Sequence, residues 1–382
     1  MDNFYPKQYL DDSSYEINHN YLKEQFSEVD VILNEIKKVV KNSDYTLGSA
    51  VDELENLIAK EAMTKYGIGV GSGTDALFLS LKALNIGPGD EVITTTYTFY
   101  ATIGAIVTAG AKPVFCDVGH DYNINPSEIE SKITNKTKAI IPVHWAGKPC
   151  AMDEINQIAK SFNLKVIEDA CHAIQGEYNK KRCGSLGDIG CFSFHPLKNL
   201  NVWGDGGIVT TNNKEIAEKI KLIRNHGLIN RDTCIEFAYN SRLDTIQAVI
   251  AKHLIEKKIL ENITFSRIRN AILLDELLGN IPEIQLVKRS SALKEVFHLY
   301  MFKTSRRDEL YEHLRNQNID AKIHYPTPMH LQPAAKYLGY KLGDFPIAES
   351  LAKQSISLPV HEFIDKSKAL IMSESIHSFF NF

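Results

Sequence analysis

The chain has 382 residues, a formal net charge of −4, 44% apolar residues and 24% charged residues. This length accommodates two domains, or one large and one small domain. The acidic balance and the lack of a basic stripe argue against a DNA- or RNA-binding module. No apolar run reaches the roughly 18 residues of a membrane helix, and the polar N-terminus lacks a signal-peptide core, so we expect a cytoplasmic protein without membrane contact.

The six cysteines are scattered along the chain, with no Cys-x-x-Cys pair and no histidine at zinc-finger spacing. We therefore expect reduced, partly buried thiols and no metal site. The cysteines are Cys116, Cys150, Cys171, Cys183, Cys191 and Cys234.

The N-terminal part of the chain changes character near residue 26. Residues 1–25 show no clear periodicity, and we interpret them as an extended arm over the body of the protein. The segment Val29–Val40 has one apolar face, which predicts a helix that ends near Asn42 and Ser43. A second helix is predicted from about Ser49.

The first candidate binding motif follows a short predicted strand, Tyr66–Val70. Gly71 and Gly73 allow a tight turn, and Thr74 and Asp75 lie where the next helix starts. Free backbone N–H groups and the helix dipole meet at such a turn, which predicts a phosphate site. The glycine spacing only imitates a dinucleotide fingerprint, and the ribose-binding acid is missing, which disfavours a nicotinamide cofactor. A purely structural turn is the remaining alternative.

Strands and helices then alternate, which predicts parallel strands joined by right-handed crossovers. The predicted strands are Glu91–Thr95, Pro113–Val118, Thr137–Val143 and Leu164–Ile167, and the predicted helices are Thr98–Ala109, Ser127–Ile133 (capped by Ser127) and Met152–Phe162.

Three residues of this part are candidates for contacts to a ring-shaped ligand. Asp169 and His172 follow the carboxyl end of a predicted strand, where an open α/β sheet places its ligand crevice. A carboxylate there can keep a pyridine nitrogen protonated, with His172 in reach of a ring hydroxyl. Phe99, at a strand-to-helix corner, can lie flat on the ring. The structural alternatives are a helix-capping acid, a hydrogen-bonded histidine and a core phenylalanine.

The most distinctive segment is Asp188–Gly207. It contains the apolar strand Ile189–Phe194, a break at Pro196, the single lysine Lys198 and a glycine-rich turn. A lysine held at a strand end among apolar neighbours can be desolvated, which lowers its pKa and makes the neutral amine a nucleophile toward an aldehyde. This is the requirement for a Schiff base with pyridoxal phosphate. A solvated surface lysine is the alternative on residue type alone.

The second half of the chain predicts an α+β domain. Two helices are predicted at Lys214–Asn225 and Asp244–Lys257. A charged helical stretch then runs to about Leu278 and connects the large domain to this α+β domain. This predicts a large domain at residues 1–255 and a small domain at 256–382. The further predicted strands are Ile281–Val287, Ala292–Phe302 and Ala321–His324, and the helices are Asp308–Asn316, Ile347–Ser355 and Lys366–Phe380.

Ten segments in order closely resemble the sugar-nucleotide aminotransferases of the DegT type, a branch of the fold type I pyridoxal phosphate enzymes. They are GSGTDAL, GPGDEVITTTYTFYAT, GAKPVFCDV, TKAIIPVHWAGKPCAMD, VIEDACHA, GSLGDIGCFSFHPLKN, GDGGIVTT, RNHG, YNSRLDTIQA and IHYPTPMHLQP. The resemblance covers about Asn34 to Pro359. It implies an α/β fold: a three-layer, mostly parallel sheet in an aspartate aminotransferase-like large domain, with a smaller α+β C-terminal domain.

The resemblance also implies roles for individual residues. Lys198 resembles the Schiff-base lysine, and Asp169 resembles the partner of the pyridinium nitrogen. The other implied cofactor contacts are Gly73, Thr74 and Ser193 at the phosphate, Phe99 on the ring, His172 at the ring hydroxyl, and Asn240 from the neighbouring subunit. Because members of the family are homodimers, the resemblance implies a homodimer with active sites shared between subunits.

The implied reaction moves an amino group from L-glutamate to a keto group of a nucleotide-linked deoxysugar, with pyridoxamine 5′-phosphate as the intermediate form of the cofactor. Relatives that dehydrate a sugar carry histidine in place of Lys198, so amino transfer is favoured over a dehydratase. The segment Tyr239–Asp244 resembles enzymes that aminate C3 rather than C4.

The candidate substrate contacts are Arg242, His324, Tyr325 and His330, because such side chains donate hydrogen bonds to phosphates and hydroxyls. Ordinary packing between domains is the alternative. The sequence around Trp145 and Trp203 departs from the common family pattern. A small phosphorylated ketone, such as a triose phosphate, is therefore an alternative acceptor of the amino group. A cofactor-dependent regulator of this fold would need a DNA-binding domain, for which we expect no room at either end.

Overall fold

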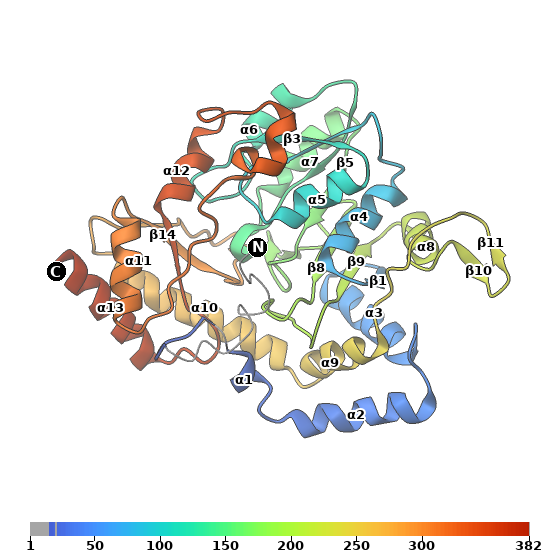
Figure 1. Cartoon of the computed structure of the whole chain (residues 1–382), viewed down its shortest axis with the longest axis horizontal. Coiled ribbons are helices and arrows are strands. Elements are labelled where there is room, and N and C mark those ends of the chain that lie inside the picture. The colour runs from blue at the N-terminus through green and yellow to red at the C-terminus, as the bar shows by residue number, and fades with distance from the viewer. Residues whose placement is uncertain (1–14, 20, 382) are drawn as a thin grey trace.

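The computed structural model describes residues 15–19 and 21–381 and is built around one seven-stranded sheet (Figure 1). The strand order is β1-β9-β8-β5-β4-β2-β3. Every strand except β9 runs in one direction, because β9 pairs antiparallel with both of its neighbours. The expected mostly parallel sheet is confirmed. Its strands are β1 (Tyr66–Val70), β2 (Glu91–Thr95), β3 (Lys112–Cys116), β4 (Thr137–Ile141), β5 (Lys165–Asp169), β8 (Ile189–Ser193) and β9 (Gly207–Thr211).

Helices cover both faces of this sheet, so the large unit has the expected three layers. Alternate side chains of each strand point to opposite faces; Ile140 and Ile141, for example, belong to two different apolar clusters. One face packs on α4 (Gly73–Ala83), α5 (Tyr100–Thr108) and α8 (Lys214–Ile223). The other packs on α3 (Ser49–Glu61), α6 (Pro126–Ile129), α7 (Met152–Ser161) and α9 (Thr245–Glu256), with α2 (Val29–Asn42) against α9.

The C-terminal part forms a second apolar core around a small antiparallel sheet, β12-β14-β15. The predicted boundary after residue 255 falls near the end of α9 and stays a prediction. The elements of this part are α10 (Ile259–Leu278), β12 (Gln285–Leu286), β14 (Tyr300–Lys303), α11 (Arg307–Asn316), α12 (Pro346–Gln354), β15 (Ser355–Leu358) and α13 (Lys366–Phe380). The remaining short elements are α1 (Leu22–Gln25), β6 (Glu177–Tyr178), β7 (Lys181–Arg182), β10 (Leu228–Asn230), β11 (Thr233–Cys234) and β13 (Leu293–Lys294).

Several predicted elements of the C-terminal part were wrong in extent. The predicted strand Ala292–Phe302 is two short strands, β13 and β14, because the Val296 N–H between them bonds to the Gly147 carbonyl (3.0 Å) instead of to a strand. The predicted strand Ala321–His324 makes only an isolated bridge from Lys322 to Ser357. Ile281–Val287 shortens to β12, and β15 follows α12 without a turn.

Two differences concern the large unit. Strand β9 was not predicted, because its glycines and threonines directly follow a glycine-rich turn. The helix after residue 125 is a single α-turn capped by Asn125, whose Oδ1 accepts the Ser127 N–H (3.2 Å), so Ser127 is not the cap.

The described end of the N-terminal arm packs against the C-terminal part. Ile17 forms a parallel bridge with Ile319, and the His361 Nε2 donates to the Asn18 carbonyl (2.8 Å). The Tyr21 ring stacks on His361 with centroids 4.7 Å apart. The rest of the predicted arm, at residues 1–14, lies outside the described residues. Among residues 15–19 and 21–381, no helix combines the length and apolar character that a bilayer crossing requires.

The buried histidines of this contact predict acid sensitivity of the fold. Burial lowers the pKa of His361 from 6.5 to about 3. Above pH 6.5 the ring is neutral in both folded and unfolded chains, whereas below it only the unfolded chain binds the proton, so stability falls as the pH falls. When the pH is lowered from 7 to 5, we expect the free energy of unfolding of His361→Gln to fall by about 2 kcal/mol less than that of the wild type. Urea unfolding at the two pH values measures this difference.

The control is His120→Gln, because His120 is exposed. It should follow the wild-type pH dependence. Equal losses for His361→Gln and the wild type would contradict the prediction.

Candidate active site

Lys198 lies in a turn that the carboxyl end of β8 and the return into β9 hold in place. The Phe194 N–H donates to the Gly206 carbonyl (2.8 Å), and the Lys198 N–H donates to the His195 carbonyl (2.8 Å). Asn201 closes the turn, because its Nδ2 donates to the Pro196 carbonyl (2.6 Å). The lysine backbone is therefore fixed by local hydrogen bonds that do not use its side chain.

The surroundings of the Lys198 amine lower its pKa. Burial is the largest cause, and Cys171 and Asp169 partly oppose it. The residue as a whole is half-buried. A lysine with a lowered pKa supplies more of the neutral amine, which is the form that attacks a carbonyl group and accepts a proton.

Asp169, the last residue of β5, holds a buried carboxylate in the neighbouring strand position. It pairs in parallel register with Cys191 of β8 and is 6% exposed. The Thr102 hydroxyl donates to Oδ2 (2.7 Å) and the Cys171 N–H donates to Oδ1 (3.3 Å). These two donors hold the carboxylate in position and leave lone pairs for a cationic partner. Thr102 was not found in the sequence, because a threonine inside a helix carries no distinctive signal.

The start of α4 and the end of β8 approach each other too closely for a side chain between them. A Cβ on Gly73 would lie 2.6 Å from the Cβ and 3.1 Å from the Oγ of Ser193. Ser72 caps the helix, with its Oγ accepting the Asp75 N–H (3.0 Å). The N-terminus of α4, with the exposed Thr74, therefore lies close to Ser193, and a helix N-terminus suits an anion.

His172 lies between two other rings. Its centroid is 5.1 Å from that of Trp145 and 4.1 Å from that of His298, and its Nδ1 is buried without a hydrogen-bond partner. Burial lowers the pKa of His172 well below 6.5, and the charge of Lys198 adds to the shift, so the ring is neutral. His298 was not among the sequence candidates, because it lies in an apolar run that resembles a core strand.

An aromatic group extends from the sheet edge toward the C-terminal part. Phe99 is 44% exposed, and its ring centroid is 5.9 Å from that of Tyr325. Tyr325 also lies 5.7 Å from Trp145. The preceding His324 donates or accepts through Nδ1 with the Ser357 hydroxyl (2.9 Å), and burial lowers its pKa to about 3. Phe99, His324 and Tyr325 thus belong to one neighbourhood with His172.

The other candidates have different partners. His330 is buried, with Nε2 3.1 Å from the Glu349 carboxylate and its ring against Phe345, so its contacts lie in the C-terminal part. Arg242 donates to the Asn225 side chain (3.0 Å), and Asn240 is exposed at the base of the β10–β11 hairpin. Within the described part of the chain, these contacts of His330 and Arg242 lead to residues other than Lys198.

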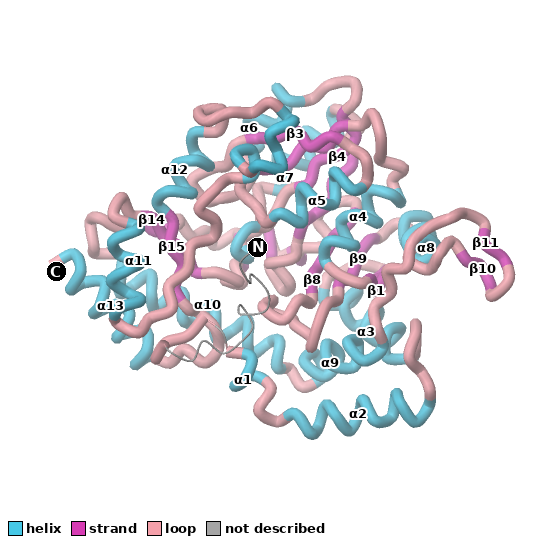
Figure 2. Tube along the Cα trace, viewed as in Figure 1, coloured by secondary structure: helices cyan, strands magenta, loops and turns pink. Residues whose placement is uncertain are grey.

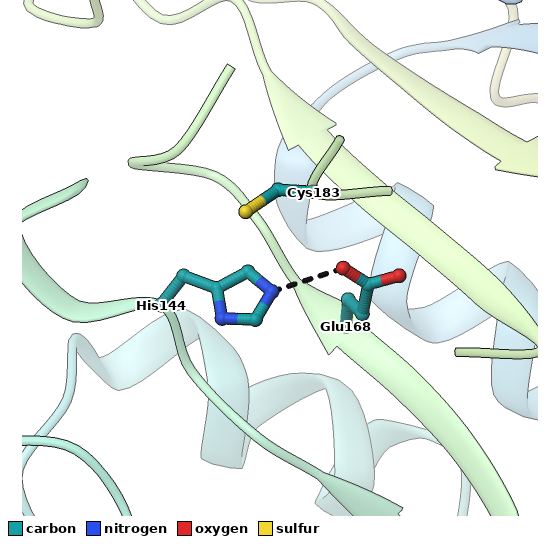
Figure 3. A group of neighbouring side chains, drawn as sticks. All are labelled: His144, Glu168 and Cys183. Carbon is teal, nitrogen blue, oxygen red and sulfur yellow. Dashed lines mark hydrogen bonds and ion pairs between the residues drawn. The ribbon is translucent and has the colours of Figure 1, made fainter. Parts of the chain in front are cut away.

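Behind Asp169, on the opposite face of β5, lies a buried group of His144, Glu168 and Cys183 (Figure 3). These three residue types can bind a metal, but the His144 and Glu168 side chains are engaged in hydrogen bonds within the protein. Glu168 accepts hydrogen bonds from the His144 Nε2 (2.9 Å) and from three backbone N–H groups, while His144 Nδ1 accepts the Cys150 N–H (3.1 Å). The His144 ring is therefore a neutral donor to the carboxylate, and the group stabilises the fold.

The chain is similar to known aminotransferases. Residues 27–375 match the model of the DegT/DnrJ/EryC1/StrS aminotransferase family. The chain is 42% identical to a pleiotropic regulatory protein of Geobacillus stearothermophilus, over 94% of this chain and 97% of that protein. It is 39% identical to the dTDP-3-amino-3,6-dideoxy-alpha-D-galactopyranose transaminase of Aneurinibacillus thermoaerophilus, over 95% and 97% of the two chains.

Among solved structures, S. venezuelae DesV in complex with a ketimine intermediate superposes with a TM-score of 0.91 at 35% identity, over 94% of this chain and 97% of that chain. The match of the family model over most of the chain, together with these relatives, identifies the protein as a member of the DegT/DnrJ/EryC1/StrS aminotransferase family.

Proposed function

We propose that this aminotransferase uses pyridoxal 5′-phosphate to move an amino group from L-glutamate to the C3 keto group of a nucleotide-linked deoxysugar. The observation that carries the proposal is the lysine–aspartate pair at the carboxyl edge of the sheet. Lys198 has a lowered pKa, and Asp169 lies in the next strand with its carboxylate fixed by Thr102.

The residues of the site fit this cofactor. The Gly73–Ser193 lining leaves no room for a Cβ and suits a phosphate, and the unpartnered His172 Nδ1 belongs to a ring with hydrogen-bonding capacity left for a ligand. Asp169 would hold the ring nitrogen, Phe99 would cover a ring face and Lys198 would carry the covalent bond. When bound, pyridoxal 5′-phosphate supplies an electron sink for the bond that is broken at the substrate carbon.

The chain's own residues account for the proton transfer. With the cofactor bound, the Lys198 amine would take the proton from the glutamate Cα as general base and, once protonated, would act as general acid at the cofactor carbon that receives the amino group. Its lowered pKa places more of the amine in the neutral form that accepts a proton. The Asp169 carboxylate, fixed by Thr102 and by the Cys171 N–H, would keep the ring nitrogen of the bound cofactor protonated through charge pairing.

The choice of C3 and of a nucleotide sugar is supported by the transaminase from A. thermoaerophilus, whose name places the amino group at C3 of a dTDP-sugar. Tyr325 and Phe99 offer aromatic surface, and His324 offers a neutral hydrogen-bonding ring, at the side where a sugar would enter. Arg242 is proposed to meet the phosphates. A small phosphorylated ketone would leave this aromatic group without a contact. A dehydratase is disfavoured by the intact Lys198.

A homodimer is part of the proposal. The β10–β11 hairpin projects from the body of the molecule (Figures 1 and 2). Phe237, which follows β11 in the chain, is fully exposed. Ile229 and Ile235 are 58% and 59% exposed. Such apolar side chains on a projecting segment favour burial in an interface. A partner seated there would receive Asn240 at its own phosphate site, as the family resemblance implies.

The covalent role of Lys198 can be tested directly. We expect Lys198→Ala to fold normally and to lose at least about 1,000-fold in turnover, because it removes both the amine that binds the cofactor and the proton carrier. Borohydride reduction and peptide mass analysis should find a pyridoxyl adduct on Lys198 of the wild type. The control is Lys214→Ala, since the Lys214 side chain is 71% exposed. An adduct on another lysine, or wild-type turnover by Lys198→Ala, would refute the assignment.

The position of amination can be tested in the reverse direction. A dTDP-linked 3-amino-3,6-dideoxyhexose should yield glutamate from 2-oxoglutarate, while the 4-amino isomer should react at least about 100-fold more slowly, because the wrong carbon is presented to Lys198. Dihydroxyacetone phosphate with glutamate should give no product. Preference for the 4-amino sugar would overturn the C3 assignment, and turnover of the triose phosphate would overturn the substrate class.

The dimer is tested by a charge on the hairpin. Phe237→Asp should raise the dimer dissociation constant at least about tenfold, because a buried charge replaces a buried ring, and turnover should fall together with dimer content. Sedimentation over a concentration series measures this. Tyr337→Asp is the matched control, since Tyr337 is 66% exposed outside the hairpin. An unchanged dissociation constant for Phe237→Asp would contradict the interface.

A further inference from the structure

The ring of His298 makes the closest ring contact of His172. The two centroids are 4.1 Å apart at an interplanar angle of 38°. Trp145, at 5.1 Å, provides the other neighbour, so the His172 ring is held by one residue of the large unit and one residue of the C-terminal part. Neither histidine Nδ1 has a hydrogen-bond partner among the described residues, and ring contact is what joins the pair.

The backbone around His298 is fixed by the site itself. The Val296 carbonyl accepts the Asn199 Nδ2 (3.0 Å), and Asn199 directly follows Lys198. The Val296 N–H donates to the Gly147 carbonyl (3.0 Å) and the Leu299 N–H donates to the Ala146 carbonyl (3.3 Å). The segment is thus bonded both to the lysine turn and to the loop after Trp145. Its backbone is therefore tied to the lysine turn through Asn199, the residue after Lys198.

Gly147 and Phe297 show how close this approach is. A Cβ on Gly147 would lie 3.0 Å from the His172 carbonyl oxygen and 3.0 Å from the backbone nitrogen of His298. Phe297, beside His298, has a φ of 46°, which a bulky residue adopts only where its surroundings impose it. Two strained or sterically exclusive backbone positions therefore converge on one histidine pair.

Four basic groups act electrostatically on the His298 ring. They are His172 and Lys198 from the large unit, Arg267 from α10 and His324 from the C-terminal part. Burial and these neighbours lower the pKa of His298 well below 6.5, so the ring carries no charge. A neutral ring whose Nδ1 has no hydrogen-bond partner among the described residues contributes shape and contact area.

We propose that His298 is a positioning residue of the active site, which packs against His172 and fixes the orientation of the His172 ring beside Lys198. It acts through ring contact and not through a hydrogen bond of its own. The inference rests on the proposed function, because the orientation of His172 matters only if that ring meets the cofactor. It assigns to the C-terminal part a direct share in building the cofactor site.

The test separates the ring from its nitrogen atoms. His298→Phe keeps an aromatic ring and removes the nitrogens, whereas His298→Gln keeps a polar group and removes the ring. We expect the dissociation constant for pyridoxal 5′-phosphate, measured by fluorescence on the apo-protein, to rise about tenfold in His298→Gln. In His298→Phe the increase should be smaller by a factor of at least about three, because an aromatic ring is kept. The visible circular dichroism of the bound cofactor should change in the same order, because it reports ring orientation.

A double-mutant cycle shows whether His298 acts through His172. In a His172→Ala background, His298→Gln should have little further effect on the dissociation constant, since the contact is already gone. Additive effects would overturn the proposal. So would the reverse order, with His298→Gln closer to the wild type than His298→Phe, which would indicate a hydrogen-bonding role.

Folding and function are controlled separately. Thermal unfolding of each apo-variant shows whether the fold survives, and if His298→Gln does not fold, the comparison of wild type with His298→Phe and with His298→Leu decides, since Leu should show the larger loss. A wild-type protein without a pyridoxyl adduct on Lys198 would mean that the proposed function fails. A wild type that carries the adduct, with all His298 variants equal to it, would mean that only this inference fails.

Discussion

The arrangement of the sheet edge depends on the hydrogen bonds that the buried Glu168 carboxylate accepts. It is fully buried and accepts four hydrogen bonds: one from His144 and three from the loop that leads into β8, at Gly184, Leu186 and Gly187. A buried anion is tolerable only when its lone pairs are satisfied in this way. Because the same loop begins the strand that ends before Lys198, and because the His144 N–H donates to the Asp169 carbonyl (3.1 Å), this carboxylate ties together the two strands of the site.

Successive residues of β5 divide the work between the two faces of the sheet. Glu168 points toward the loop and His144, and Asp169 points toward Thr102 and α5. This follows from the period of two of a β-strand, which places neighbouring side chains on opposite faces. The two acids therefore have different partners: one is neutralised by protein donors, and the other keeps hydrogen-bonding capacity for a ligand.

The sequence predicts the large unit well because its information is local. The strand-to-turn signals around Gly73, Asp169 and Lys198 depend on neighbours a few residues away, and the motifs occur in chain order. The C-terminal strands were less predictable, since the run from Ala292 to Phe302 reads as one strand until the distant Gly147 carbonyl takes the Val296 N–H. His298 and Thr102 were not found for the same reason: each gains its meaning from a residue far along the chain, His172 and Asp169 respectively.

The return of the chain from the lysine turn straight into β9 has a consequence for how such a site can change over time. The turn is closed by main-chain bonds between Phe194 and Gly206 and by Asn201, and none of these involves the amine of Lys198. The hydrogen bonds that hold the turn are therefore independent of the Lys198 side chain. A different side chain at this one position would leave these bonds of the loop in place, so a single codon change could alter the proposed chemistry while the architecture persists.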